Sequence, residues 1–232
     1  MFEGPNFISM NEHKNEGNSH YSLRSLLEVY TDTFDAESLK QLEACEIPMI
    51  LRHLRDSHQL FLNKLLPEIE QSCYQIRRKY REDFPIQFVL SNLFLGFKLK
   101  LEEHIQLEES ILFPYIDQLL EVIKVGPNYG NVKEVLNTYS VNHFLDEHDD
   151  VETALEEIRK LIVTHSSSLS HCLPFKMFLN QLKRFEKELH MHSWLEETFL
   201  MRKVDRLEEQ LRQFSNESIF NFEWNHYSKR LN

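Results

Sequence analysis

Hydrophobic residues recur three and four positions apart through most of this chain, a spacing that places them on one face of an α-helix. Four long segments show the pattern: residues 48–80, 85–123, 131–165 and 174–214. The links between them are short, and GPNYG at 126–130 is the clearest turn. Two shorter helices are expected, one at 22–30 and one after Asp35. Residues 1–20 show no period and are predicted to form a flexible leader.

Four amphipathic segments of about 30 residues or more, joined by short links, predict an all-α fold. We expect an up-down-up-down four-helix bundle of antiparallel neighbours over residues 47–214. A leader with short helices at 1–46 precedes it, and a tail at 215–232 follows. Proline is tolerated in a first helical turn, so Pro48 can open the first helix, whereas Pro67 lies inside it and is expected to kink it.

Charge and cysteine content exclude several classes of function. The chain has 26 basic and 37 acidic side chains, a formal net charge of -11, which opposes binding to nucleic acid or to an anionic membrane surface. Its three cysteines include no CxxC pair, so neither a disulfide framework nor a thiolate zinc site is indicated. We find no secretion signal and no continuous apolar span, and we therefore expect a cytoplasmic protein.

Two segments share the pattern HxxLEE[ST]: residues 104–110 and residues 192–198. In each, histidine and glutamate are four apart and share one helix face, where both can ligate one metal centre. The bare HxxxE spacing occurs four times and is weak evidence. The longer pattern is more specific, because Leu107 and Leu195 are expected to hold the same face against the core.

The levels of the candidate residues along neighbouring helices provide a second indication of a shared metal site. In an antiparallel hairpin, two residues are level when they are equally far from the connecting loop. His148 and His192 are equally far from the loop at 166–174, and Glu108 and His148 are equally far from the turn at 126–130. His58 and Glu108 are equally far from the first link. One layer at mid-bundle therefore collects six residues: His58, His104, Glu108, His148, His192 and Glu196.

Burying this many imidazoles and carboxylates without partners would cost several kcal/mol, and a bound metal removes that cost. The alternative interpretation is that these residues are solvated surface side chains and not ligands. That is ordinary for any one of them but improbable for all six together. The set is too nitrogen-rich for calcium or magnesium. Two iron ions fit best, with Glu108 and Glu196 bridging and four terminal histidines, although ligand type leaves manganese and zinc open. An open coordination position would bind dioxygen or nitric oxide.

The chain resembles the hemerythrin-like domain of the di-iron proteins that repair iron–sulfur clusters damaged by nitric oxide or oxidants. The likeness covers about residues 47–205 and rests on four segments: HIQLEESILFP (104–114), HMHSWLEETFL (190–200), RDSHQLFLNKLLPEIE (55–70) and FLDEHDDV (144–151). It implies the same terminal histidines and bridging glutamates. Oxygen-carrying hemerythrins match less well, because His143 and His148 are five positions apart rather than four.

The resemblance implies a role in the response to nitrosative or oxidative stress, by cluster repair or iron donation, with iron–sulfur proteins as further partners. The alternative is a di-iron sensor of oxygen or nitric oxide that signals to a partner, and a metal-free association bundle is a third possibility. Repair proteins of this type commonly begin with a paired-cysteine domain, whereas residues 1–46 contain only Cys45. Glu109 and Glu197 are expected to form solvated ion pairs, with some chance of contacting the histidines.

Overall fold

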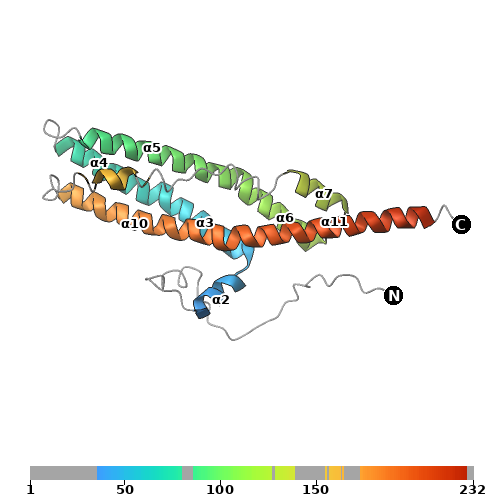
Figure 1. Ribbon diagram of the computed structural model, residues 1–232. Helices are drawn as coiled ribbons and strands as arrows, with labels where there is room; N and C mark the ends of the chain where they lie inside the picture. Colours follow the sequence, from blue (N-terminus) through green and yellow to red (C-terminus); the bar gives the residue numbers. More distant parts are fainter. Residues whose placement is uncertain are drawn as a thin grey trace.

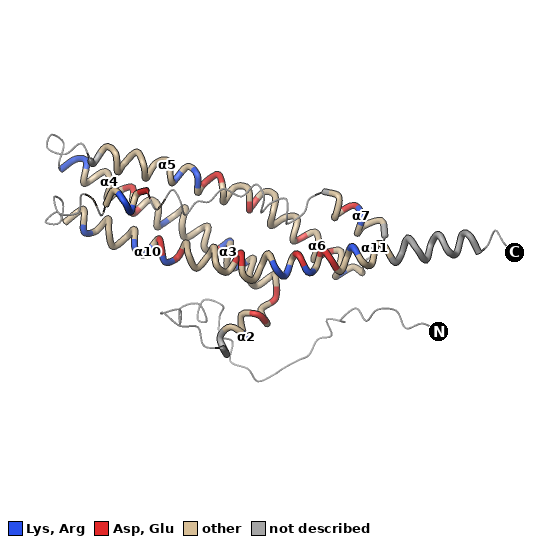
Figure 2. Tube along the Cα trace, viewed as in Figure 1, with Lys and Arg blue, Asp and Glu red and all other residues tan. Residues whose placement is uncertain are grey.

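The computed structural model of the chain describes residues 36–79, 86–126, 129–138, 155, 157–162, 164 and 173–228. Within these ranges the chain is helical and contains no strand, which confirms the predicted all-α class. Long helical rods lie side by side, and a short helix near the N-terminal end lies to one side of them (Figure 1). Basic and acidic residues are interspersed along the rods (Figure 2).

The first rod consists of α3 (Ile47–Leu60), the π-helical segment η1 (Phe61–Leu65) and α4 (Leu66–Lys79). It corresponds to the helix predicted over 48–80. Pro48 lies in its first turn, where the missing N–H breaks no helical hydrogen bond. The short helix expected after Asp35 is α2 (Ala36–Ala44), whereas the one expected at 22–30 lies outside the described residues.

The second rod consists of α5 (Ile86–Leu107), the π-helical segment η2 (Glu108–Leu112) and α6 (Phe113–Val125). It ends at Gly126, whose φ of 98° is a conformation that glycine adopts without a steric penalty. The next helix, α7 (Tyr129–Thr138), begins inside the predicted GPNYG turn. Residues 155, 157–162 and 164 are also helical, and the rest of the predicted third helix is outside the described part of the chain.

The last rod consists of α10 (Leu173–Leu195), the π-helical segment η3 (Glu196–Met201) and α11 (Arg202–Ser228). Its start agrees with the predicted one. Its helix continues past Phe214, where the sequence predicted an end, and the predicted tail is therefore helical as far as Ser228. In Figure 1, α11 extends beyond the neighbouring helices.

Each rod contains a π-helical segment, and proline accounts for two of the three. In η1 and η2 the hydrogen bonds span five residues, as from the Phe113 N–H to the Glu108 carbonyl. Pro67 and Pro114 each come two positions after the end of a π segment. Proline lacks an N–H, so the carbonyl four positions earlier loses its α-helical donor, and this favours five-residue spacing. The predicted irregularity at Pro67 is thus a π segment placed just before the proline.

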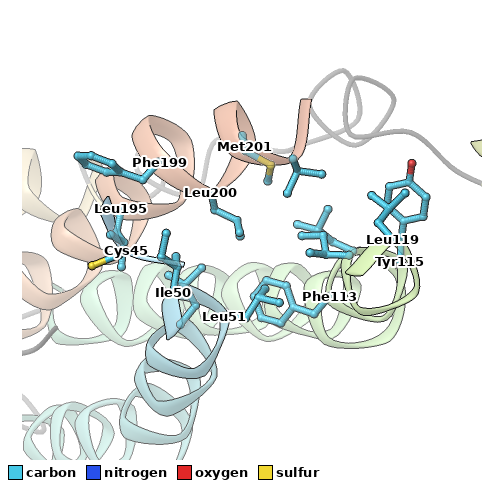
Figure 3. Close-up of a cluster of buried hydrophobic side chains, with 14 of the residues drawn as sticks. Cys45, Ile50, Leu51, Phe113, Tyr115, Leu119, Leu195, Phe199, Leu200 and Met201 are labelled. Atoms are coloured by element: carbon cyan, nitrogen blue, oxygen red, sulfur yellow. The ribbon is translucent and has the colours of Figure 1, made fainter. Parts of the chain in front are cut away.

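The apolar core falls into two clusters along the rods. One cluster joins α2, α3, α6, α7, η3 and α11, and Figure 3 shows part of it, including Ile50, Phe113 and Leu200. The other joins α4, α5 and α10 and contains Phe61, Phe97 and others. The two clusters adjoin near the starts of η1, η2 and η3, where most of the buried polar side chains lie. No helix in the described ranges has the length and apolar character needed to span a membrane.

Candidate metal centre

The two HxxLEE segments occupy equivalent positions in two different rods. His104 and His192 lie in the last turns of α5 and α10, and Glu108 and Glu196 are the first residues of η2 and η3. His192, Glu108 and Glu196 are buried, and the side chain of His104 is 12% exposed. His58, in the last turn of α3, is completely buried beside them. Three separate rods therefore converge on one buried polar cluster.

Glu108 is at the centre of this cluster. One of its carboxylate oxygens lies 2.8 Å from Nε2 of His58, and the other lies 2.8 Å from Nε2 of His104. Nε2 of His192 lies 3.9 Å from a Glu108 oxygen and 3.8 Å from an oxygen of Glu196. A single carboxylate thus faces three imidazoles that come from three rods.

These atoms divide into two overlapping groups, each compact enough to surround one metal ion. The first group is His58, Glu108 and His192, and the second is His104, Glu108 and Glu196. Within each group, one ligand atom from each residue lies within 4.8 Å of the others. Because Glu108 belongs to both groups, it occupies the position expected of a carboxylate that bridges two ions.

The polar atoms of the cluster are better placed to coordinate a metal than to hydrogen-bond with one another. Among the described residues, five buried atoms here lack a partner with hydrogen-bond geometry, despite the short distances: His58 Nε2, both Glu108 oxygens, His192 Nδ1 and Glu196 Oε1. Leaving a buried polar group unpaired costs roughly 1–3 kcal/mol. Imidazole nitrogens and carboxylate oxygens that converge in this way are the donor set of non-haem iron, manganese or zinc sites. The residues present therefore fit the metal that the sequence implies.

The pKa shifts of the clustered side chains favour metal binding with release of a proton. Burial alone would raise the pKa of Glu108, but the neighbouring imidazoles of His104 and His58 hold that pKa well below its usual range. Burial and the negative charge of Glu108 raise the pKa of Glu196 well above its usual range. Burial lowers the pKa of His192 to about 3, so its ring is neutral at pH 7. A neutral imidazole and an ionised carboxylate are the ligand-competent forms, and a cation would displace the Glu196 proton.

A chain of contacts fixes the orientation of His58. Its Nδ1 atom lies 2.7 Å from Oε1 of Glu109, which leaves Nε2 facing Glu108. Oε2 of Glu109 lies 3.7 Å from Nε of Arg55, and Arg55 donates a 2.8 Å hydrogen bond to Asp117. A carboxylate on the distal ring nitrogen is a common support for a metal-binding histidine. The sequence left open whether Glu109 contacts a histidine, and the structure places it against His58.

Aromatic rings enclose the cluster on its apolar sides. The His58 ring stacks on Phe113 at a centroid distance of 5.6 Å and an interplanar angle of 6°. Phe61 meets His192 edge to face, also at 5.6 Å. Both phenylalanines are almost fully buried, so they limit water around the imidazoles. These neighbours were not identified from the sequence, because aromatic residues at helical spacing are usually ordinary core residues.

The structure brings together five of the six predicted residues: His58, His104, Glu108, His192 and Glu196. The sixth, His148, lies outside the described residues, as does His143. The expectation for the two leucines of the shared pattern was half wrong. Leu195 is fully buried, but Leu107 is 40% exposed, because the described helices cover the two rods differently at these positions.

Fold and site together define an all-helical protein with a buried histidine–glutamate cluster whose geometry could hold a metal ion. No protein-family model matches the chain. The chain is 20% identical over 184 residues to the iron–sulfur cluster repair protein ScdA of Staphylococcus epidermidis, a match that covers 78% of this chain and 78% of that protein. ScdA from a second strain of the same species gives the same values.

Proposed function

We propose that this chain is a hemerythrin-like protein that holds two non-haem iron ions and serves iron–sulfur cluster repair or iron donation under nitrosative or oxidative stress. One observation carries the proposal: two compact ligand groups share the buried carboxylate of Glu108. A shared carboxylate between two histidine-containing groups is the arrangement of a two-metal centre. The similarity to ScdA supports the choice of repair as the process.

The proposed architecture is a four-helix bundle over residues 47–214, with residues 1–46 and 215–232 as additions to it. Three of its helices are the rods that carry the five clustered residues. The fourth would be the predicted helix over 131–165, which begins as α7. On this proposal His148 supplies the fourth terminal histidine and joins the group of His104 and Glu196. Among the described residues that group has one imidazole, whereas the other group has two.

Contacts and the resemblance together suggest a role for each residue. Glu108 belongs to both groups and would bridge the ions, whereas Glu196 belongs to one group and its bridging role rests on the resemblance. The histidines would bind the ions terminally. Glu109 holds the ring of His58 in place through its Nδ1 atom. Phe61 and Phe113 limit water around the imidazoles. When bound, a pair of iron ions supplies one-electron redox chemistry and an open position for a small diatomic ligand such as dioxygen or nitric oxide.

A second candidate function is a di-iron sensor that passes a structural change to a partner. It is favoured by the continuity of the last rod. Glu196 opens η3, and η3 continues directly into α11, which runs to Ser228. A π-helical segment marks a functional irregularity in many helices. A change in the contacts of Glu196 would therefore act at the start of a long helix.

Restoration of a damaged iron–sulfur enzyme distinguishes the two functions. An iron–sulfur dehydratase inactivated by nitric oxide is incubated with the reduced, iron-loaded protein, with the apoprotein, or with an iron-treated Glu108→Ala variant. Repair or donation predicts recovery of activity only with the loaded wild-type protein. Reversible gas binding without recovery would favour the sensor. Equal recovery with the Glu108→Ala variant would show that loosely bound iron, and not this centre, is responsible.

A further inference from the structure

Arg55 contacts both of the side chains that hold the ring of His58. Nδ1 of His58 lies 2.7 Å from Oε1 of Glu109, and the His58 ring stacks on Phe113 at an interplanar angle of 6°. The guanidinium carbon of Arg55 lies 5.3 Å from the centre of the Phe113 ring, and Nε of Arg55 lies 3.7 Å from Oε2 of Glu109. One cation therefore supports the imidazole at its edge, through a carboxylate, and at its face, through an aromatic ring.

Asp117 anchors Arg55 in this position. It accepts a 2.8 Å hydrogen bond from a terminal nitrogen of the guanidinium group. A guanidinium is planar and carries donors on several edges, so it can stack on a ring and pair with two carboxylates at once, which the ammonium of lysine cannot do. The side chains of Arg55 and Asp117 are 38% and 52% exposed, and ion pairs at such exposure add little to the stability of a fold. The contacts of Arg55 therefore matter for the position that they give to other side chains.

The spacing of these residues brings them to one interface between two rods. Arg55 precedes His58 by three positions in α3, so the two side chains share a face of that helix. Glu109, Phe113 and Asp117 follow one another at intervals of four in the second rod and share a face in the same way. Both faces consist of described residues, so the arrangement does not depend on the predicted third helix.

The second HxxLEE segment repeats the two acids but not the ring. Glu197 and Asp205 have the same spacing as the acids of the first segment, with Met201 between them in place of a phenylalanine. Within the described ranges no cation is paired with Glu197 or Asp205. Support of this kind is therefore observed for His58 alone among the described parts of the two motifs, and it comes from Arg55 on a neighbouring rod.

From these contacts we infer that Arg55 is a positioning residue for the metal ligand His58, acting through Glu109 and Phe113. By holding the carboxylate and the ring in place, it keeps Nδ1 of His58 against Glu109 and Nε2 directed at Glu108. A histidine whose ring is already oriented loses less rotational freedom when a metal binds. The inference rests on the proposed function in taking His58 as a ligand, whereas the contacts that position the ring do not require a metal.

Positioning and simple charge have opposite effects at this site. As a nearby positive charge, Arg55 would repel a cation, and its removal would strengthen metal binding. As a positioning residue, its removal frees Glu109 and the His58 ring and so weakens metal binding. The Nδ1 proton of His58 gives the same distinction. Loss of charge alone would make Glu109 a stronger acceptor for this proton, whereas loss of position lets the proton exchange with water.

The affinity for ferrous iron, measured anaerobically by competition with a chromophoric chelator, is the first test. Arg55→Met removes the charge but keeps an unbranched side chain, and it should lower the affinity at least about threefold. Arg52→Met is the matched control, because Arg52 is exposed one turn earlier in α3 and makes no ion pair within the described residues. This control should keep the wild-type affinity. In a Glu109→Gln background, the effect of Arg55→Met should fall below about half on a logarithmic scale, because one of its two routes is gone.

An unchanged or higher affinity in Arg55→Met would overturn the inference, and so would an equal loss in Arg52→Met. Circular dichroism checks that each variant remains helical, and Arg55→Gln takes the place of Arg55→Met if the latter does not fold.

Hydrogen exchange in the metal-free protein is the second test, and it separates this inference from the proposed function. The Nδ1 proton of His58, followed by NMR in the isotope-labelled full-length protein, should exchange at least about tenfold faster in Arg55→Met than in the wild type or in Arg52→Met. An unchanged exchange rate would overturn the inference. If the wild-type protein binds no ferrous iron, the two-iron proposal fails, while the exchange rates still show whether Arg55 positions His58.

Discussion

The Nδ1 atom of His58 lies 2.7 Å from Oε1 of Glu109, although the two residues are 51 positions apart in the chain. This contact fixes which ring nitrogen of His58 faces the cluster. Burial lowers the pKa of His58, but the carboxylates of Glu108 and Glu109 outweigh that effect and raise it. The two negative charges on opposite edges of the buried ring thus favour its protonated form, and a metal at Nε2 would take the place of that proton.

Glu109→Gln should therefore weaken metal binding without removing a ligand. Loss of such a supporting carboxylate typically lowers metal affinity by about 10–100-fold. The affinity is measured by competition with a chromophoric chelator. Glu197→Gln is the matched control, because Glu197 has the same position in the second HxxLEE segment and no contact with an imidazole of the described residues is observed for it. Equal losses in both variants would mean that general charge, and not the His58 contact, matters.

Replacing Glu108 should affect both metal positions, because Glu108 belongs to both ligand groups. We expect about two ions per wild-type chain, close to none in Glu108→Ala, and about one in His58→Ala. Elemental analysis after gel filtration measures the content. Two ions retained by Glu108→Ala would remove this residue from the proposed bridging position.

Metal removal should lower the thermal stability of the protein. Five buried polar atoms of the described cluster lack hydrogen-bond partners, and a ligand at 100 times its Kd stabilises a fold by about 2.7 kcal/mol. For a protein of this size, that corresponds to a rise in Tm of roughly 5–10 °C. Scanning calorimetry with iron and with chelator measures the difference. Glu108→Ala should show no metal-dependent rise, and an equal rise in that variant would point to binding elsewhere.

His148 and His143 can be separated by matched alanine variants. Side chains five positions apart on a helix point about 140° away from each other, so only one of them can face the cluster. We expect His148→Ala to lose iron and His143→Ala to keep it. Iron content together with the near-ultraviolet absorption of the loaded protein measures the outcome. The reverse result would mean that the third helix is rotated relative to the predicted register.

Alkaline pH should destabilise the fold through Cys73. Burial first, and the charge of Glu70 second, raise the pKa of Cys73 from 9.0 to about 12. Above pH 9 the thiol ionises in the unfolded chain but stays protonated in the folded one, so stability falls as pH rises towards 12. Between pH 7 and pH 10 the loss of stability is on the order of 1 kcal/mol. Urea unfolding at both pH values, compared with Cys73→Val, isolates the effect, and an identical pH dependence in the two proteins would contradict it.

The rods themselves could be predicted from the sequence, since helical periodicity and proline positions are local signals. The segments 48–80 and 85–123 agree closely with the helices observed there. The end of the last helix was placed too early, at Phe214 instead of Ser228, because its aromatic-rich ending carries no glycine or proline stop signal. The π segments were also missed, although Pro67 and Pro114 indicate where two of them end.

The repeated HxxLEE motif predicted part of the site but not the surroundings of each copy. HxxLEE placed His104 with Glu108, and His192 with Glu196, on the faces where the structure has them. The same motif did not separate Glu109, which contacts His58, from its counterpart at position 197. Nor did it distinguish the buried leucine at 195 from the exposed one at 107. Two copies of one motif therefore have different surroundings, because the surroundings depend on which rods lie alongside.

By itself, the sequence determined the helical class, the two histidine–glutamate faces and the heights at which they lie, since each of these follows from the regular turn and rise of an α-helix. Only the tertiary structure decided which side chains touch across the rods. His58 meets Glu108 and Glu109, and Arg55 meets Asp117, through contacts between residues that are far apart in the sequence. The physical reason is that rotation of one packed helix against another depends on side-chain interdigitation over the whole interface, and no local pattern encodes it.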